Sequence, residues 1–349
     1  MSRIIMQPSG KSVECAYGDT VLMALEKAGY ALPNNCRAGA CGECKVKVTA
    51  GQFDQGMVLD MALSQEERRQ GYGLMCMAKP ISDELTIEWG TEDARPKLFP
   101  PREDALFVVT DKRAVAERVV ELRLRPVGQP IRYWSGQYVT LGNPRADIPP
   151  RAYSISNAPR PDGELVLQVA RADDGVTSQW IHDRLAIGES VKLSGAYGTF
   201  IGDPGVDTAV LCLAAGTGLA PILALTEAAL RRGFRKPVTL LFSARMEADV
   251  YARGLMAWWR TKHRAFDYRI TLTREEAEGC LSGRVDAVLP GLFPDLSKHT
   301  IFAAGSPAFV DSCVATVKAL GARPELIHTE GFFARQQPEI PDAAHLLNL

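Results

Sequence analysis

The chain has 349 residues, of which 46% are hydrophobic and 23% are charged. This composition is ordinary for a globular protein, and a prior of about 150 residues per domain suggests two or three domains. The net charge of −1 lacks the positive excess of nucleic-acid-binding proteins, so we expect no nucleic-acid partner. No apolar run has the length of a membrane-spanning helix or a secretory signal, which predicts a cytoplasmic protein without a membrane span.

Residues 1–95 carry the patterns of several short strands and one helix. The helix is expected over 19–30, with Asp19 or Thr20 as its N-cap and Gly29 at its end. Alternation of hydrophobic and polar residues predicts strands on both sides of it. These strand patterns lie within 3–10, 11–17, 45–51 and 74–89.

Four cysteines in this region are candidate metal ligands. Cys36, Cys41 and Cys44 follow a C-x4-C-x2-C spacing, and Cys76 comes after 31 intervening residues. This spacing is a ligand signature of plant-type [2Fe–2S] clusters. Such a cluster carries single electrons, so the rest of the chain is expected to supply and receive them.

Other uses of these cysteines fit the sequence less well. A structural zinc site usually shows two C-x2-C pairs, whereas this chain has one. A Rieske centre needs two histidine ligands, and the nearest histidine is His182. Disulfides are uncommon in a chain without an export signal. Four isolated cysteines are expected to be small buried residues: Cys15, Cys212, Cys280 and Cys313.

The cysteine region resembles ferredoxins of the plant and vertebrate type over about the first quarter of the chain. The resemblance implies a β-grasp fold. Gly39 and Gly42 in the run between the ligands allow the backbone to fold round the cluster. The small side chains of Ala38 and Ala40 leave room for backbone N–H groups to reach the sulfurs.

The pattern changes twice after this region. The proline-rich residues 96–102 are predicted to be a linker. In 103–203, many short strand-like runs separated by turns predict an antiparallel β-barrel. In 204–340, strands alternate with helices, which predicts a parallel α/β sheet. The expected fold is therefore multidomain, with α+β and α/β parts.

A flavin site is predicted in the barrel segment, where Arg151, Tyr153 and Ser154 form an R-x-Y-S motif. Arginine can pair with a pyrophosphate through two hydrogen bonds. A tyrosine ring can stack on the flavin, and a serine hydroxyl can bond near its reactive nitrogen. An exposed arginine beside a core tyrosine is the ordinary alternative.

This motif resembles that of the ferredoxin–NADP reductase superfamily, and two later segments support the resemblance. Gly175, Val176 and Ser178 resemble the loop that opens a helix and implies contacts with the flavin phosphates. Residues 195–200 resemble the motif G-P-x-G-x-F, with Ala196 where proline is usual.

A nicotinamide nucleotide site is predicted in the α/β segment. Gly216, Thr217, Gly218 and Pro221 mark a turn from an apolar strand into a helix, as in the G-T-G-x-A-P turn of the same superfamily. Glycines let the backbone approach a pyrophosphate, and the helix N-terminus stabilises its charge. The resemblance also implies nucleotide contacts after two other strands and an aromatic cover for the flavin: Ser243, Arg245, Gly305, Ser306, Pro307 and Phe332.

The order of the three parts resembles the reductases of bacterial multicomponent oxygenases, such as naphthalene, benzoate and terephthalate dioxygenases and xylene monooxygenase. The resemblance implies a [2Fe–2S] cluster, FAD and NADH, with no catalytic residue beyond these cofactors; FMN in place of FAD stays open. Electrons would pass from NADH through FAD and the cluster to a terminal ring-hydroxylating or Rieske-type oxygenase, or to its small ferredoxin. The protein is expected to be a monomer.

The sequence leaves two kinds of alternative function open. The acceptor could be a diiron monooxygenase or a CDP-sugar deoxygenation enzyme. The chain could also be a redox sensor without an oxygenase partner.

The nucleotide preference is expected to favour NADH. Glu247 and Asp249, which follow the second strand of the α/β segment, would repel the 2′-phosphate of NADPH. Ser243 and Arg245 at the same strand end could bind that phosphate instead. Two carboxylates against one arginine leave a site that is not clearly cationic.

Overall fold

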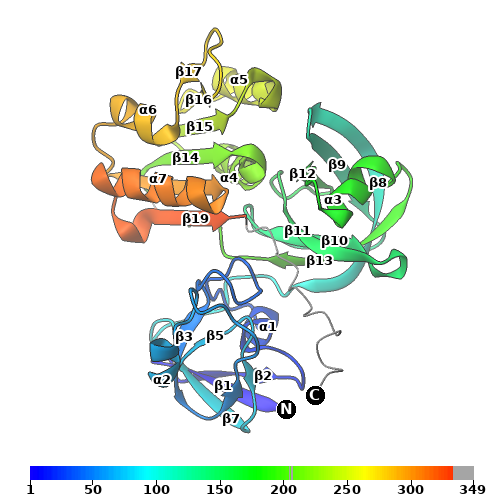
Figure 1. The fold of residues 1–349 in the computed structure, drawn as a ribbon, viewed down its shortest axis with the longest axis vertical. Helices are drawn as coiled ribbons and strands as arrows, with labels where there is room; N and C mark the ends of the chain where they lie inside the picture. Colours follow the sequence, from blue (N-terminus) through cyan, green and yellow to red (C-terminus); the bar gives the residue numbers. More distant parts are fainter. Residues whose placement is uncertain (204, 206, 333–349) are drawn as a thin grey trace, which may run out of the picture.

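The computed structural model describes residues 1–203, 205 and 207–332. Within them the chain folds into three units, each built round its own sheet (Figure 1). The predicted combination of a β-grasp unit, an antiparallel barrel-like sheet and a parallel α/β sheet is confirmed. The predicted boundaries at 95, 103 and 203 stay predictions, and the predicted end at 340 lies outside the described residues.

The first unit is a five-stranded sheet in the order β2-β1-β7-β3-β5, in which β1 and β7 run parallel. The helix α1 (Val21–Lys27) is shorter than expected; Thr20 caps it by accepting a hydrogen bond from Met23 N, and Gly29 follows it with φ +81°. A buried core fills the space between this helix and the sheet. The other elements are β1 (Ser2–Gln7), β2 (Lys11–Cys15), β3 (Lys45–Ala50), β4 (Phe53–Asp54), α2 (Gln65–Arg69), β5 (Tyr72–Leu74), β6 (Lys79–Pro80) and β7 (Glu84–Glu88).

The second unit is a six-stranded antiparallel sheet in the order β11-β10-β13-β8-β9-β12. Its inner face holds a single apolar core in which Phe107, Leu122 and Leu167 are fully buried. The elements are β8 (Arg102–Ala116), β9 (Val119–Pro126), β10 (Tyr138–Asn143), β11 (Ile148–Ser154), β12 (Leu165–Ala170), α3 (Val176–Asp183) and β13 (Ser190–Tyr197).

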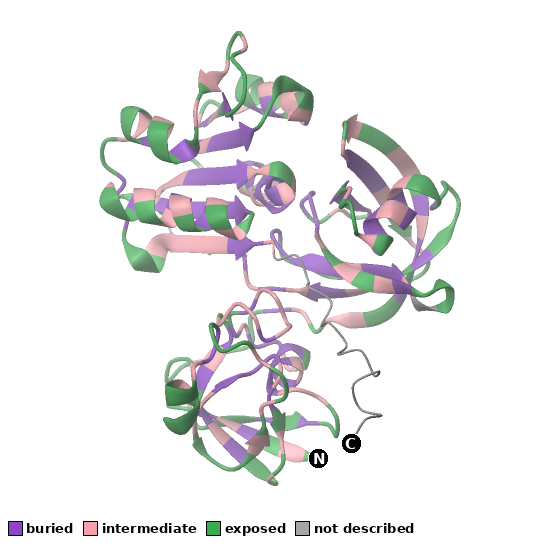
Figure 2. Ribbon diagram, in the orientation of Figure 1, coloured by how far each residue is buried: buried purple, intermediate pink, exposed green. Residues whose placement is uncertain are grey.

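The third unit is a parallel sheet in the order β17-β16-β15-β14-β18-β19, with apolar cores and helices on both faces. Figure 2 shows that its central strands are buried over most of their length. The strand order reverses beside β14, because β15 pairs on one side of it and β18 on the other. Ligands of open α/β sheets bind at the carboxyl ends of the strands at such a point.

The elements of this unit follow the expected alternation of strands and helices. They are β14 (Ala209–Ala215), α4 (Leu219–Arg231), β15 (Val238–Ala244), α5 (Arg253–Lys262), β16 (Phe266–Leu272), β17 (Leu281–Ser282), α6 (Val285–Leu292), β18 (His299–Gly305), α7 (Pro307–Ala319) and β19 (Ile327–Gly331). None of the helices in the described part of the chain is long and apolar enough to cross a membrane.

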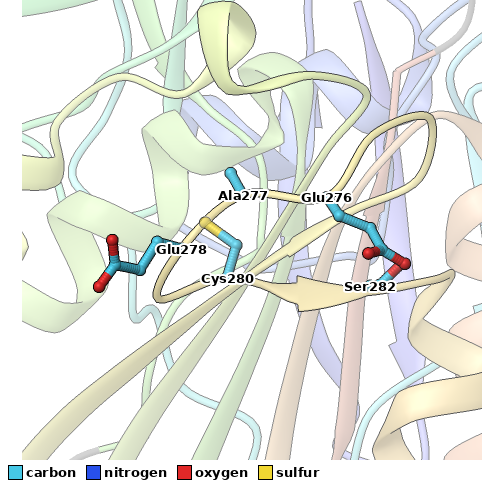
Figure 3. Close-up of a pocket in the computed structure, with 5 residues that line it drawn as sticks. All are labelled: Glu276, Ala277, Glu278, Cys280 and Ser282. Atoms are coloured by element: carbon cyan, nitrogen blue, oxygen red, sulfur yellow. The ribbon is translucent and has the colours of Figure 1, made fainter.

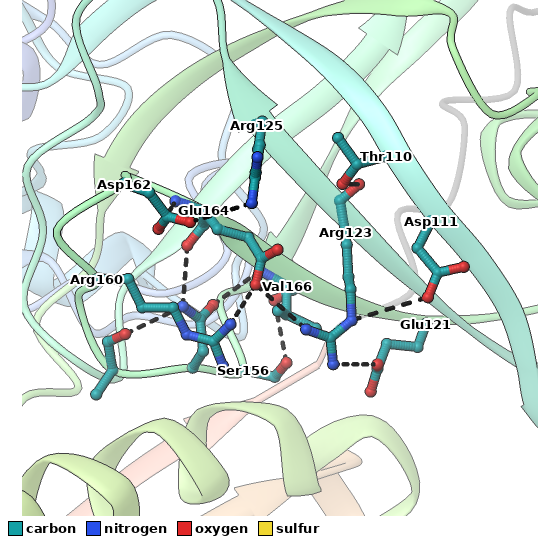
Figure 4. A network of polar contacts seen from close by, with 12 residues as sticks. Thr110, Asp111, Glu121, Arg123, Arg125, Ser156, Arg160, Asp162, Glu164 and Val166 are labelled. Atoms are coloured by element: carbon teal, nitrogen blue, oxygen red, sulfur yellow. Dashed lines mark hydrogen bonds and ion pairs between the residues drawn. The ribbon is translucent and has the colours of Figure 1, made fainter.

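An ion-pair network braces the loop that joins β11 to β12 within the second unit (Figure 4). Glu164, at the end of this loop, accepts a hydrogen bond from Arg123 Nη1 on β9 at 3.2 Å and pairs with Arg160. Earlier in the same loop, Ala158 N donates to Glu227 Oε2 on α4 at 2.7 Å. The loop is therefore held by its own sheet on one side and by the third unit on the other.

The predicted linker is not a free tether, because both of its neighbours bind it. On the first unit, Gly29 O accepts hydrogen bonds from Lys97 N and Leu98 N at 2.8 and 2.9 Å. On the second unit, Trp134 Nε1 donates to Lys97 O at 2.9 Å, and the Trp134 ring stacks on Phe99 with 5.5 Å between centroids. Arg132 covers the same Phe99 ring at 4.0 Å.

Replacing Trp134 with alanine should loosen this linker. The change removes a stacked aromatic pair and one hydrogen bond, worth together about 1–2 kcal/mol of local stability. Trypsin should then cleave after Lys97 roughly 5–30-fold faster, as measured by the rate at which two fragments appear. Trp258→Ala, at an exposed tryptophan on α5, is the matched control and should leave this rate unchanged. Equal rates in both variants would contradict the pinned linker.

Candidate functional site

The four predicted cluster ligands lie together as two pairs in the first unit. The Cys36 and Cys41 thiols are within hydrogen-bonding distance of each other, and so are the thiols of Cys44 and Cys76. Within the described residues, no three His, Cys, Asp or Glu side chains converge as ligands of one metal ion. Two thiolates for each of two irons is the arrangement that a [2Fe–2S] cluster needs, so the donor set fits that group.

The backbone of the cluster loop supplies donors to these sulfurs. Ala38 N and Ala40 N lie 3.4 and 3.3 Å from Cys36 Sγ. The hydrogen bond from the Cys41 thiol, together with these N–H groups, lowers the pKa of Cys36 to about 5, while the same thiol–thiol contact raises the pKa of Cys41. Gly39 has φ +68°, and a Cβ there would lie 2.9 Å from a backbone oxygen of the next loop, so only glycine fits.

The three residues of the R-x-Y-S motif lie on β11. Arg151 is half-buried, Tyr153 packs partly against the barrel core, and Ser154 is buried. Burial raises the pKa of the Tyr153 phenol. The arrangement leaves the ring and the guanidinium at the edge of the barrel, as contact with a flavin would require.

The start of α3 lies beside this strand. Thr177 Oγ1, in the first turn of α3, donates to Pro149 O of β11 at 2.5 Å. Gly175 is the N-cap and provides no side-chain cap, so the first N–H groups of the helix are not used by a cap. Ser178 serves the loop itself, since its hydroxyl accepts from Ala172 N at 3.1 Å and donates to Gly175 O at 2.9 Å. Val176 is exposed.

The glycine turn of the third unit lies at the strand-order reversal. A Cβ on Gly218 would lie 2.1 Å from Ala304 O, so the turn after β14 passes directly against the end of β18. Gly216 has φ +55°, and its carbonyl accepts a hydrogen bond from Tyr251 Oη at 3.0 Å. Glycine is thus required where the backbone of this turn passes the end of β18.

The remaining predicted nucleotide residues gather at the same edge of the sheet. Thr217 belongs to the turn itself, and Pro221 is buried in the first turn of α4. Gly305 ends β18, Ser306 caps α7 by accepting from Phe309 N, and Pro307 begins that helix.

The charged residues after β15 are paired with one another. Ser243, near the end of that strand, is buried. Asp249 binds Arg245 through two contacts, Nε–Oδ2 at 3.0 Å and Nη2–Oδ1 at 3.2 Å. Glu247 pairs with Arg253 at 3.2 Å. The Arg245 guanidinium is therefore already neutralised by a carboxylate.

A shallow hollow lies in the loop between β16 and β17, and the close-up in Figure 3 shows its lining. The Glu276 and Glu278 side chains point to opposite sides, so their charges do not gather at one point. Cys280, expected to be buried, is only half-buried here, and that expectation is wrong for this residue because it sits in a surface loop. The other three isolated cysteines are buried as expected: Cys15, Cys212 and Cys313.

One buried acid is a site residue that the sequence did not single out. Glu330 on β19 accepts a hydrogen bond from Ser154 Oγ at 3.3 Å and is 7% exposed. Burial raises the pKa of Glu330 to about 8, although the hydrogen bond from Ser154 acts in the opposite direction and lowers this pKa. Phe332, two residues later, is half-buried and donates its N–H to Gly305 O at 2.8 Å. Ser154, Glu330 and Phe332 thus bring the flavin motif and the nucleotide edge together.

Comparisons with known proteins divide the chain in the same way. Residues 4–80 match the family of 2Fe-2S iron-sulfur cluster binding domains, 107–201 the oxidoreductase FAD-binding domains, and 212–315 the oxidoreductase NAD-binding domains. The reductase subunit of an aromatic O-demethylase from Amycolatopsis sp. (strain ATCC 39116 / 75iv2) is 33% identical over 93% of this chain and 96% of its own length. The reductase component of a phenol 2-monooxygenase from Pseudomonas sp. (strain CF600) is 30% identical over 90% of this chain and 89% of its own.

Solved structures agree over 95% of the chain. The crystal structure of an Amycolatopsis cytochrome P450 reductase matches with a TM-score of 0.87 and 29% identity, covering 95% of this chain and 99% of that one. The ferredoxin reductase of a carbazole 1,9a-dioxygenase shares the fold, with a TM-score of 0.76 and 24% identity, covering 95% of this chain and 98% of that one.

These domains and likenesses define an NAD(P)H-dependent oxidoreductase with a [2Fe–2S] domain, an FAD domain and an NAD domain. The chain belongs to the family of flavin- and [2Fe–2S]-containing reductase components of multicomponent oxygenases. The assignment of individual flavin and nucleotide contacts stays a prediction.

Glu330→Gln should change how stability depends on pH. A carboxyl whose pKa is raised on folding keeps a proton that the unfolded chain has released. Its contribution to the free energy of unfolding therefore falls as pH rises from 4.5 to about 8. The isosteric glutamine cannot titrate, so the variant should gain stability relative to the wild type across this window. Thermal unfolding midpoints at pH 5, 6.5 and 8.5 measure the difference, and parallel pH profiles would contradict it.

Proposed function

We propose that this protein carries electrons from NADH through FAD and a [2Fe–2S] cluster to an oxygenase. The observation that carries the proposal is the contact between Ser154 of the flavin motif and Glu330 at the nucleotide edge, with both motifs on one chain behind a ferredoxin unit. In this order the flavin would receive electrons from NADH and pass them to the cluster, and the cluster would pass them to the oxygenase.

The residues of the chain would hold these groups in fixed places. Arg151 would bind the flavin pyrophosphate together with the N–H groups at Gly175, while Tyr153 would cover the ring. Phe332 would lie beside the ring from the side of the third unit. FAD supplies the step between a hydride, which carries two electrons, and a cluster that takes one electron at a time.

The nucleotide would bind across the strand-order reversal of the third unit. The turn at Gly216 and Gly218 would receive the pyrophosphate, and Ser306 and Pro307 would border the nicotinamide. Ser243 and Arg245 would lie toward the adenosine. Ala304 stands where the superfamily usually has cysteine, so no thiol from that position would touch the nicotinamide.

The acceptor is proposed to be the terminal oxygenase itself or its small ferredoxin. Relatives are named for an aromatic O-demethylase, for phenol and xylene monooxygenases, and for several dioxygenase systems. A cytochrome P450 is the second candidate for the electron acceptor, favoured by the likeness to a cytochrome P450 reductase over 95% of the chain.

We further propose that the protein works as a monomer in the cytoplasm. All eight cysteines lie within the described residues and none forms a disulfide, which suits a reducing compartment.

Cys41→Ser should separate the two halves of the electron route. The variant should lose the visible absorbance of the cluster and, with it, most cytochrome c reduction. NADH-dependent reduction of ferricyanide, which the flavin can carry out directly, should largely survive. Loss of both activities in a variant that keeps its FAD would show that the carriers do not act in this order.

NADH preference is proposed to depend on the pairing of Arg245 with Asp249. Asp249→Asn should free the guanidinium to bind a 2′-phosphate, and a charge-assisted hydrogen bond is worth about 1.5–3 kcal/mol. The ratio of kcat/KM for NADPH over NADH should then rise roughly tenfold or more. Glu247→Gln, whose partner is Arg253, is the matched control and should change the ratio much less. A wild-type ratio in favour of NADPH would overturn the assignment.

A further inference from the structure

Arg37 is a nearly buried charged residue whose position no cofactor explains. It follows the ligand Cys36 in the cluster loop, and its side chain is 20% exposed. Its Nη1 donates a hydrogen bond to Oε1 of Glu26 on α1. The Glu26 side chain is only 4% exposed. The guanidinium carbon of Arg37 lies 4.4 Å from the ring centroid of Tyr197, which belongs to the second unit.

These contacts hold Arg37 in one orientation. The guanidinium is fixed by the Glu26 carboxylate within its own unit and points its face at a ring of the neighbouring unit. Arg37 also has φ +52°, a backbone conformation that non-glycine residues adopt rarely. A buried ion pair of this kind contributes little net stability compared with apolar packing, because both charges lose their hydration.

Tyr197 leads directly to the flavin motif. On the sheet of the second unit, Tyr138 is the register partner of Tyr197 on one side and of Ser154 on the other. The rings of Tyr138 and Tyr197 are in contact, with centroids 5.8 Å apart. Arg37 therefore contacts Tyr197 at one end of a row of three residues on neighbouring strands. Ser154, at the other end of the row, is the serine predicted to bond to the flavin.

The linker alone cannot fix how the cluster loop faces the flavin unit. It attaches the first unit at Gly29, just after α1, and one attachment leaves the unit free to turn about that point. The contact of Arg37 with Tyr197 is a second attachment, and it lies next to a cluster ligand. Two separated attachments leave only rotation about the line that joins them, so the second one removes most of this freedom.

We propose that Arg37 is a positioning residue that holds the cluster loop against Tyr197 and thereby sets the rate of electron transfer from flavin to cluster. The inference rests on the proposed electron route. Electron tunnelling weakens steeply with distance, so a small rotation of the first unit would slow this step. Transfer of hydride from NADH to the flavin, which occurs in the other two units, would keep its rate.

The test uses the holoprotein mixed rapidly with NADH, with separate absorbance signals for flavin and cluster. Arg37→Gln and Tyr197→Leu should each slow cluster reduction about tenfold or more while flavin reduction stays at the wild-type rate. Tyr197→Phe keeps the aromatic ring, so it should keep most of the wild-type rate of cluster reduction. Arg260→Gln removes a similar stacked arginine from Tyr268 within the third unit and should change nothing.

A second readout does not depend on activity. Hydrogen–deuterium exchange should increase at residues 36–44 and at the end of β13 in Arg37→Gln and in Tyr197→Leu, with cluster and FAD contents unchanged. The double variant should be no slower than the single ones, because both remove the same contact.

The outcomes separate this inference from the proposed function. If NADH does not reduce the cluster in the wild type, the electron route itself fails. If the wild type does so and both variants match its rate and its exchange, Arg37 has no positioning role. Should Arg37→Gln lose its cluster, Tyr197→Leu decides alone, since Tyr197 lies outside the cluster unit.

Discussion

The pairing of β10 with both β11 and β13 is the constraint on which the arrangement of the three units depends. It sets Tyr197, Tyr138 and Ser154 side by side across three strands of the second unit. At one end of this row Tyr197 meets Arg37 of the cluster loop, and at the other end Ser154 meets Glu330 of the nucleotide unit. Backbone hydrogen bonds fix the spacing of the row, so the flavin unit acts as the rigid middle of the protein.

Polar contacts help to fix how the neighbouring units face each other, beside the apolar core in which Val119 of the second unit packs with residues of the third. The first unit is held at its linker and at Arg37, and Ala158 N donates to Glu227 between the second and third units. Because each such contact is directional, few of them are enough to set an orientation, and the loss of one should affect electron transfer before it affects folding.

Charge is managed differently at the two ends of the nucleotide unit. At the proposed adenosine end, Asp249 neutralises Arg245, whose exposed guanidinium lets water screen the pair. At the edge that meets Ser154, Glu330 has no cation partner within the part of the chain that the structure describes, and burial raises its pKa. In the proposed flavin site, a neutral carboxyl beside Ser154 would avoid placing a negative charge next to a flavin that becomes electron-rich on reduction.

The sequence by itself determined the iron–sulfur domain, the strand and helix patterns and the order of the parts, and it predicted the four cysteine ligands and the glycine turns, because each depends on spacing between near neighbours in the chain. It could not reveal that Ser154 meets Glu330, which are 176 residues apart, or that Arg37 lies over Tyr197. It counted Arg245 as a possible phosphate ligand and Cys280 as buried, since neither ion pairing nor exposure is visible in a motif. Those contacts were decided only when strand pairing and unit packing brought distant side chains together.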